Sequence, residues 1–266
     1  MKLWRWLTRK KKHAREKRPR RERFAELEAR IRLIVERNPL AFPPPVAERL
    51  LRPPIRVQDS RLKELPDSEG GGTARQLLGW DPSAGEDGTG RLLLFLGSFT
   101  TPDGREDPSE LDAPTILAWR LFEDLAVAAE QIENALLSDP SRDDERLWEA
   151  LGDELQARRE LAQWADDALA DNPQFFPRWM LEELAQGAFV IERGPEWASD
   201  ALGFFEDTVG GKRIVVVLGN LLALAEGQGR SWLVRELLLT LIHEFEHHYG
   251  DIRGYDPLAE RESGFL

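Results

Sequence analysis

Three of the chain's four histidines lie close together near the C-terminus, at positions 243, 247 and 248. His243, Glu244 and His247 form the pattern H-E-x-x-H. On a helix, residues four positions apart share a face, so both imidazoles can bind one metal ion while Glu244 stands beside them. Zinc suits such ligands and lowers the pKa of a bound water to about 7. With Glu244 as the proton acceptor, this arrangement predicts the chemistry of peptide hydrolysis.

The residues around the motif predict a buried helix from Ser231 to Tyr249. This segment contains neither Gly nor Pro, most of its side chains are apolar, and Ser231 is suited to cap its first turn. Five of its polar residues form one stripe: Glu236, Thr240, His243, Glu244 and His247. Polar groups are costly in a core, which favours a functional stripe. The alternative is a polar helix edge that faces solvent.

The composition limits the cellular compartments in which the protein is expected and the kinds of cysteine-based site that it can contain. The chain has 266 residues and no Cys, which excludes disulfides and thiolate metal ligands. It has no apolar run long enough to span a bilayer, and its first residues lack the apolar core of a signal peptide. We therefore expect a cytoplasmic protein.

The charge is distributed unevenly along the chain. Residues 1–23 carry a net charge of +10, which leaves −22 on the rest of a chain whose total is −12. Apolar residues accompany the basic ones at the start: Leu3, Trp4, Trp6 and Leu7. This combination favours an anionic membrane surface over nucleic acid as a partner. The alternatives are a solvated, disordered tail and a tail that folds back on the acidic body.

The sequence predicts an α+β protein in four parts. Residues 1–23 form a disordered basic tail, and residues 24–114 form a Pro- and Gly-rich region with a short helix and one strand. Residues 115–172 read as a helical hairpin, and residues 173–266 contain the H-E-x-x-H motif. Within the second part, the stretch 66–90 is predicted to be loop because of its many Gly and Pro residues. We identify no internal repeat.

Before the motif, the fourth part contains several strand-like stretches. They cover residues 188–192, 202–206 and 212–218, and the last of these has the clearest β-branched pattern. A short helix over 220–226 is expected between the last strand and the motif helix. We expect the strand 212–218 to be the sheet edge that binds an extended substrate peptide.

This arrangement resembles the small zincin-like metallopeptidases of bacteria, often called minimal zincins. The matching stretches are residues 189–192 (FVIE), 202–206 (LGFFE), 213–217 (RIVVV) and 243–250 (HEFEHHYG). The resemblance covers about residues 173–256. It implies a small sheet packed on the H-E-x-x-H helix, a zinc cofactor and a peptide or protein substrate.

The family pattern H-E-x-x-H-x-x-G-x-x-D implies an acidic third ligand at a position where this chain has Arg253. We select Asp251 in its place, because it lies four residues after His247 and Gly250 is expected to end the helix. Three further acidic residues are candidates: Asp256, Glu260 and Glu262.

Other polar and aromatic residues also flank the motif. We expect Glu246 to be exposed, since it lies off the line of His243 and His247, and His248 to cap or pack rather than to bind metal. Tyr249 is expected to pack at the helix end and Tyr255 to lie in a loop. Alternatively, a tyrosine hydroxyl here stabilises an oxyanion.

Two functions follow from these features. The first is a zinc-dependent metallopeptidase with His243, His247 and Asp251 as metal ligands and Glu244 as general base. The second is a degenerate, zincin-like metal-binding module in a protein that docks to a membrane or to a partner. The displaced third ligand favours the second function, and the intact Glu244 favours the first.

Overall fold

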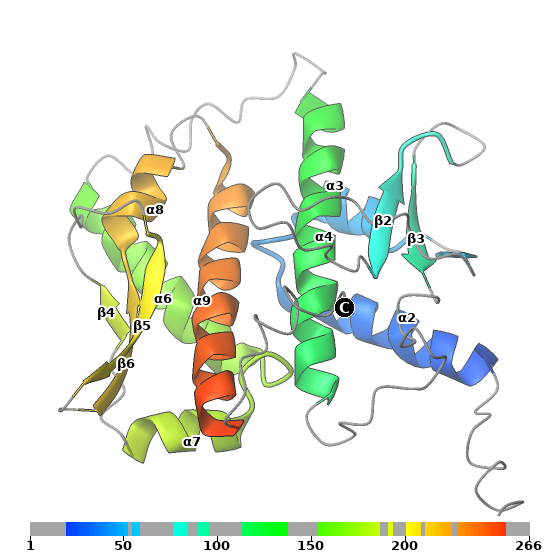
Figure 1. The fold of residues 1–266 in the computed structure, drawn as a ribbon. Coiled ribbons are helices and arrows are strands. Elements are labelled where there is room, and N and C mark those ends of the chain that lie inside the picture. Colours follow the sequence, from blue (N-terminus) through cyan, green and yellow to red (C-terminus); the bar gives the residue numbers. More distant parts are fainter. Residues whose placement is uncertain are drawn as a thin grey trace, which may run out of the picture.

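The computed structural model describes residues 20–52, 55–58, 77–84, 90–95, 113–137, 154–186, 191–193, 201–208, 211–224 and 228–253. The fold is α+β, as expected, and helices predominate (Figure 1). The basic tail lies outside these residues, except where α2 begins. None of the helices among them is long and apolar enough to cross a membrane.

The elements up to residue 137 are more numerous than expected. They are α2 (Arg20–Arg37), α3 (Pro44–Leu50), β1 (Arg56–Gln58), β2 (Leu78–Asp81), β3 (Arg91–Phe95) and α4 (Ala113–Leu137). The region 24–114 therefore contains three strands instead of one. The prediction of loop over 66–90 is wrong at β2, which pairs antiparallel with β3.

The later elements lead up to the H-E-x-x-H motif. They are α6 (Glu154–Asp171), α7 (Arg178–Gln186), β4 (Ile191–Arg193), β5 (Gly203–Thr208), β6 (Gly211–Val216), α8 (Leu218–Leu224) and α9 (Arg230–Arg253). The predicted strands and the short helix before the motif are confirmed here, with shifted ends. The second sheet has the order β4-β6-β5, with β4 parallel and β5 antiparallel to β6.

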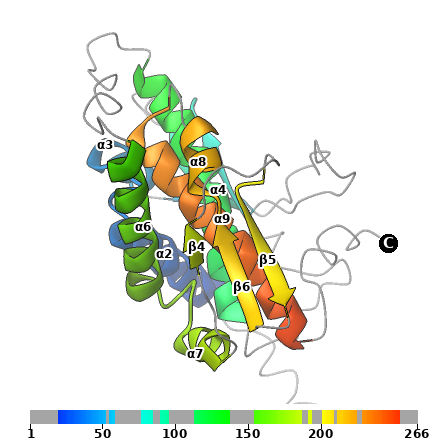
Figure 2. The ribbon, with the colours of Figure 1, turned by 90° about the vertical axis from the view of Figure 1, so that its left-hand side faces the viewer.

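Helix α9 occupies the centre of the molecule. Figure 2 looks onto the second sheet, with α9 behind β5 and β6, while α4 packs against another side of α9 (Figure 1). Helix α6 also packs on α9. Because α9 lies between them in Figure 1, α4 and α6 do not form the predicted hairpin.

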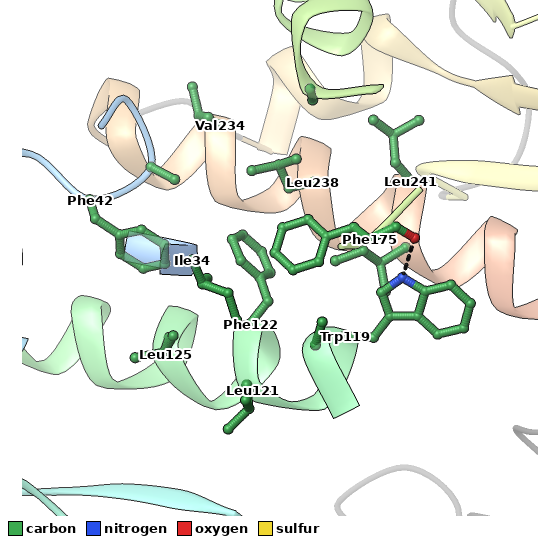
Figure 3. Packing of buried hydrophobic residues seen from close by; sticks show 14 of the residues in the cluster. Ile34, Phe42, Trp119, Leu121, Phe122, Leu125, Phe175, Val234, Leu238 and Leu241 are labelled. Carbon is green, nitrogen blue, oxygen red and sulfur yellow. Dashed lines mark hydrogen bonds between the residues drawn. The ribbon is translucent and has the colours of Figure 1, made fainter. Parts of the chain in front are cut away.

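One hydrophobic core joins the early and late parts of the chain. The cluster of buried residues extends from Leu27 in α2 to Tyr249 in α9 (Figure 3). In it, Phe122 of α4 packs edge-on against Phe175, 5.2 Å between ring centroids, and the indole nitrogen of Trp119 donates a hydrogen bond to the Phe175 carbonyl. The boundary expected near residue 173 is therefore not a break in the core.

A buried ion pair fixes α9 on α4. Arg235 is 2 % exposed, and its guanidinium binds the Glu133 carboxylate through both terminal nitrogens. The same guanidinium donates to the Ala41 carbonyl at 2.8 Å. Ser231, predicted to cap α9, instead lies within the helix and donates to Glu133. These contacts hold the first turns of α9 against the N-terminal elements.

Candidate metal centre

The motif histidines stand one turn apart on α9 and face each other. Their Nε2 atoms are 3.3 Å apart, and their rings are nearly perpendicular with centroids 4.8 Å apart. His243 is exposed and His247 is half-buried. Two nitrogens bound to tetrahedral zinc at about 2.0–2.1 Å lie about 3.3–3.4 Å from each other. The pair therefore has the separation that a shared zinc ion requires.

Glu244 lies beside the pair but is buried. Only 3 % of the residue is exposed, and burial raises the pKa of its carboxyl group to about 7. Its Oε2 atom has no hydrogen-bond partner among the residues that the structure describes. A carboxyl group with a pKa near 7 both accepts and donates a proton readily at neutral pH.

Strand β5 begins directly above this carboxyl group. A Cβ atom added at Gly203 would lie 2.7 Å from Cγ2 of Thr240, 3.0 Å from the Val215 carbonyl oxygen and 3.2 Å from Oε1 of Glu244. Only glycine allows so close an approach of strand and helix. Sequence reasoning missed this role, although a glycine within an apolar strand is a known sign of close backbone approach.

The edge of the sheet is not where the sequence placed it. Strand β6, which covers most of the predicted 212–218, is the central strand and pairs on both sides. Strand β5 is an edge strand in this order, and it packs on α9. The expectation that 212–218 forms the free edge is therefore wrong.

Three neighbours of the motif face inward. Glu246 is 1 % exposed, so the expectation that it is exposed is wrong. His248 is also buried, and its ring lies 5.6 Å from that of Phe205 in β5, so it packs as predicted. Tyr249 is buried edge-on against the rings of Trp119 and Trp179, which confirms that it packs near the helix end.

The candidates for a third ligand lie outside the described side chains. Helix α9 continues past Gly250 to Arg253, so the predicted helix end at Gly250 is wrong. Asp251 thus stands on the helix one turn beyond His247, but its side chain is not among those described. The other acidic candidates and Tyr255 also lie outside the described residues. Among the side chains described, no group of three potential ligands gathers.

Comparisons of the chain with protein-family models, with curated protein sequences and with solved structures gave no match. The interpretation of the site therefore depends on its own geometry. That geometry consists of two facing imidazoles, a buried carboxyl group beside them and an edge strand that crosses above.

Proposed function

We propose that the protein is a zinc-dependent metallopeptidase of the zincin type. The observation that carries this proposal is the 3.3 Å separation of the His243 and His247 Nε2 atoms. A hydrogen-bonded imidazole pair would also have such a spacing, but it would not need a carboxyl group buried beside it. Burying a carboxyl group without a partner for each oxygen costs stability, which favours a use for Glu244.

In this proposal His243 and His247 hold the ion through Nε2. A zinc ion held there would supply a Lewis acid for the substrate carbonyl and would lower the pKa of a bound water to about 7. Glu244 takes a proton from the attacking water and passes it to the leaving amine. In the metal-free protein, burial raises the pKa of Glu244 to about 7, and a general acid–base catalyst works best when its pKa lies near the working pH.

The substrate of this proposal is an extended peptide. Edge strand β5 pairs with β6 and packs on α9, next to Glu244. A peptide can add to such an edge through main-chain hydrogen bonds, and a strand that starts above Glu244 brings a scissile bond close to it. We therefore propose β5, and not the segment 212–218, as the strand edge that binds the substrate.

The third ligand of this proposal is a carboxylate at or after the end of α9. With a rise of about 1.5 Å per residue, Asp251 lies about 9 Å along the axis from the midpoint of the histidine pair. That distance exceeds one helical turn, so a straight helix disfavours Asp251. A straight helix favours instead a carboxylate from the chain beyond Arg253, such as Asp256, where the chain can turn back toward the histidines. Asp251 remains a candidate if the last turn opens when zinc binds.

The rival proposal is a degenerate metal-binding module that does not hydrolyse peptides, in a protein that docks to a membrane or to a partner. The +10 charge and two Trp residues of the segment 1–23 support an anionic membrane surface as the docking partner of either version. We propose a cytoplasmic and membrane-peripheral location on the same basis, and no nucleic-acid partner.

Glu244→Gln separates the two proposals. The zinc-loaded variant should keep its zinc and lose hydrolysis of fluorescently labelled casein by about 10²–10⁴-fold, because the proton acceptor is gone. Glu236→Gln is the matched control, since Glu236 is a partly buried carboxyl group on the same helix, two turns earlier. No hydrolysis by the wild type would favour the rival, and equal hydrolysis by the wild type and Glu244→Gln would contradict the role of Glu244 as proton acceptor.

A further inference from the structure

The described elements occur in the same order twice. The series α2, α3, β1, β2, β3, α4 matches the series α6, α7, β4, β5, β6, α9, with α8 added before the last helix. The sheets have the orders β1-β3-β2 and β4-β6-β5. In each, the last strand is central, parallel to the first and antiparallel to the second.

The pairing of the strands also matches in register. Leu78 opposes Leu94 in the first sheet, and Gly203 opposes Val216 in the second. The next backbone hydrogen bond is also the same in both sheets. In the first sheet, the N–H of Phe95 donates to the carbonyl of Leu77 at 2.9 Å. In the second sheet, the N–H of Val217 donates to the carbonyl of Leu202 at 2.8 Å.

The connection between the first two helices carries a sequence match. Residues 38–43 read NPLAFP and residues 172–177 read NPQFFP. In both, the buried Asn donates from Nδ2 to the carbonyl four residues earlier, and its own carbonyl accepts the backbone N–H of the fourth residue after it at 2.9 Å. Asn38 and Asn172 also bond to each other at 3.0 Å.

The two long helices are related in the same way. Helix α4 packs on β2 as α9 packs on β5, and α4 and α9 lie next to each other between the two sheets (Figure 1). They run in opposite directions. Glu133, near the end of α4, binds Arg235, near the start of α9, and Trp119 near the start of α4 packs on Tyr249 near the end of α9. An approximate two-fold axis between the helices explains both contacts.

We propose that residues 20–137 and 154–253 are two diverged copies of one unit, in which α4 corresponds to the motif helix α9. Asp124 on α4 binds the start of β2, and Glu244 on α9 lies at the start of β5. This correspondence places Glu123 at the position of His243 and Val127 at that of His247. The expectation of no internal repeat is then wrong.

The burial of the two helices supports this alignment. Leu121 and Leu125 are fully buried, as are their counterparts Leu241 and Phe245. Val127, a large apolar side chain, is 47 % exposed. It lies outside the buried stripe of α4, at the position that corresponds to the half-buried His247 in α9.

The carboxyl groups of Asp124 and Glu244 differ in their hydrogen bonds. The Asp124 carboxylate accepts the backbone N–H groups of Leu77 and Leu78 at 2.6 and 2.8 Å, so its own strand occupies it. Glu244 has no such bonds at Oε2 among the described residues, and Gly203 leaves room for its longer side chain. The carboxylate of the first copy therefore has a structural role, and this copy has no imidazoles. Its helix α4 supports α9 by packing against it.

The test is a crystal structure of the full chain with Glu123→His and Val127→His, grown with excess Zn²⁺, together with metal analysis. We expect the two copies to superpose by a two-fold rotation. We also expect a second zinc to overlie the first after that rotation. The matched control is the exposed pair Arg32→His and Glu36→His on α2, which has the same spacing.

The outcomes separate this inference from the proposed function. Copies that do not superpose, or a grafted pair that takes up no more zinc than the α2 pair while the His243 site is filled, would overturn the duplication. A His243 site that stays empty would contradict the peptidase proposal. In that case, the superposition of the two copies in the same crystals still decides the duplication.

Discussion

Glu244 and Glu236 illustrate at the residue scale how burial sets the chemistry of α9. Both carboxyl groups have a raised pKa, and in both the main cause is loss of water on burial. The nearby Glu130 carboxylate also raises the pKa of Glu236, while Arg235 opposes the shift. Glu244 stands beside the imidazole pair, whereas Glu236 lies two turns away. We therefore expect Glu236 to affect stability without affecting hydrolysis.

The variant Glu236→Gln should be more stable than the wild type at neutral pH. A carboxyl group whose folded-state pKa is raised binds its proton more tightly when folded, so stability falls as pH rises from the unfolded value of about 4.3 through the folded pKa. Gln removes this loss. In thermal unfolding, the difference in stability between Glu236→Gln and the wild type should be present at pH 7 and should vanish below about pH 4.

Glu48→Gln, on the exposed face of α3, serves as the control for the removal of a carboxyl group. Parallel stability curves of the wild type and Glu236→Gln from pH 4 to 8 would contradict the assignment of the raised pKa.

The residues of the motif could be predicted from the sequence, but their surroundings could not. The spacing of His243 and His247 fixes their common face, because helical periodicity is local. The burial of Glu246 depends on which other elements cover α9, and no local pattern contains that information. In the same way, the aromatic rings of Trp119 and Trp179 hold Tyr249 in place. Such contacts can offset the roughly 1 kcal/mol that Gly250 costs inside a helix.

At the element scale, the close crossing of β5 over α9 positions the carboxyl group. Strong local signals predicted several elements, and β6 follows its β-branched run. Strand β2 was missed because it is four residues long and contains Gly79, between stretches rich in Gly and Pro. Its pairing with β3 is a long-range contact that overrides these local preferences.

Gly203→Ala should destabilise the fold by about 1–3 kcal/mol, as overpacking of a well-packed site does. The added methyl group would lie 2.7 Å from Cγ2 of Thr240. Thr240→Ser removes that atom, so the double variant should recover part of the loss in urea unfolding.

Gly229→Ala is the matched control, because its added Cβ would meet only the Ser231 Oγ atom, at 3.9 Å. We expect that variant to unfold within about 0.5 kcal/mol of the wild type. Strictly additive effects of Gly203→Ala and Thr240→Ser would show that strand and helix do not meet there.

For the whole molecule, the shared core makes the described elements from α2 to α6 part of the same packed unit as the motif helix. The sequence hides this arrangement because the two proposed copies have few residues in common beyond N-P-x-x-F-P. The equivalence is one of strand order, register and hydrogen bonds, which different side chains can satisfy. A resemblance confined to residues 173–256 could not indicate that α4 supports α9.

The basic segment before α2 should bind vesicles that contain anionic lipid. Each Lys or Arg near such a surface contributes about 1 kcal/mol at low salt, and added salt screens the attraction. The full chain should therefore sediment with these vesicles, and a chain without residues 1–19, which keeps α2 complete, should not. Neutral vesicles are the control. Equal sedimentation of both chains at low salt would exclude a role for this segment.

Metal analysis of the purified full chain tests the central claim most directly. The protein and its His243→Ala, His247→Ala double variant would be exposed to Zn²⁺, passed through a desalting column and measured for zinc by mass spectrometry. We predict about one zinc per chain in the wild type and almost none in the variant, because the two Nε2 atoms, 3.3 Å apart, are the proposed ligands. Equal zinc content in both proteins, or none in the wild type, would contradict it.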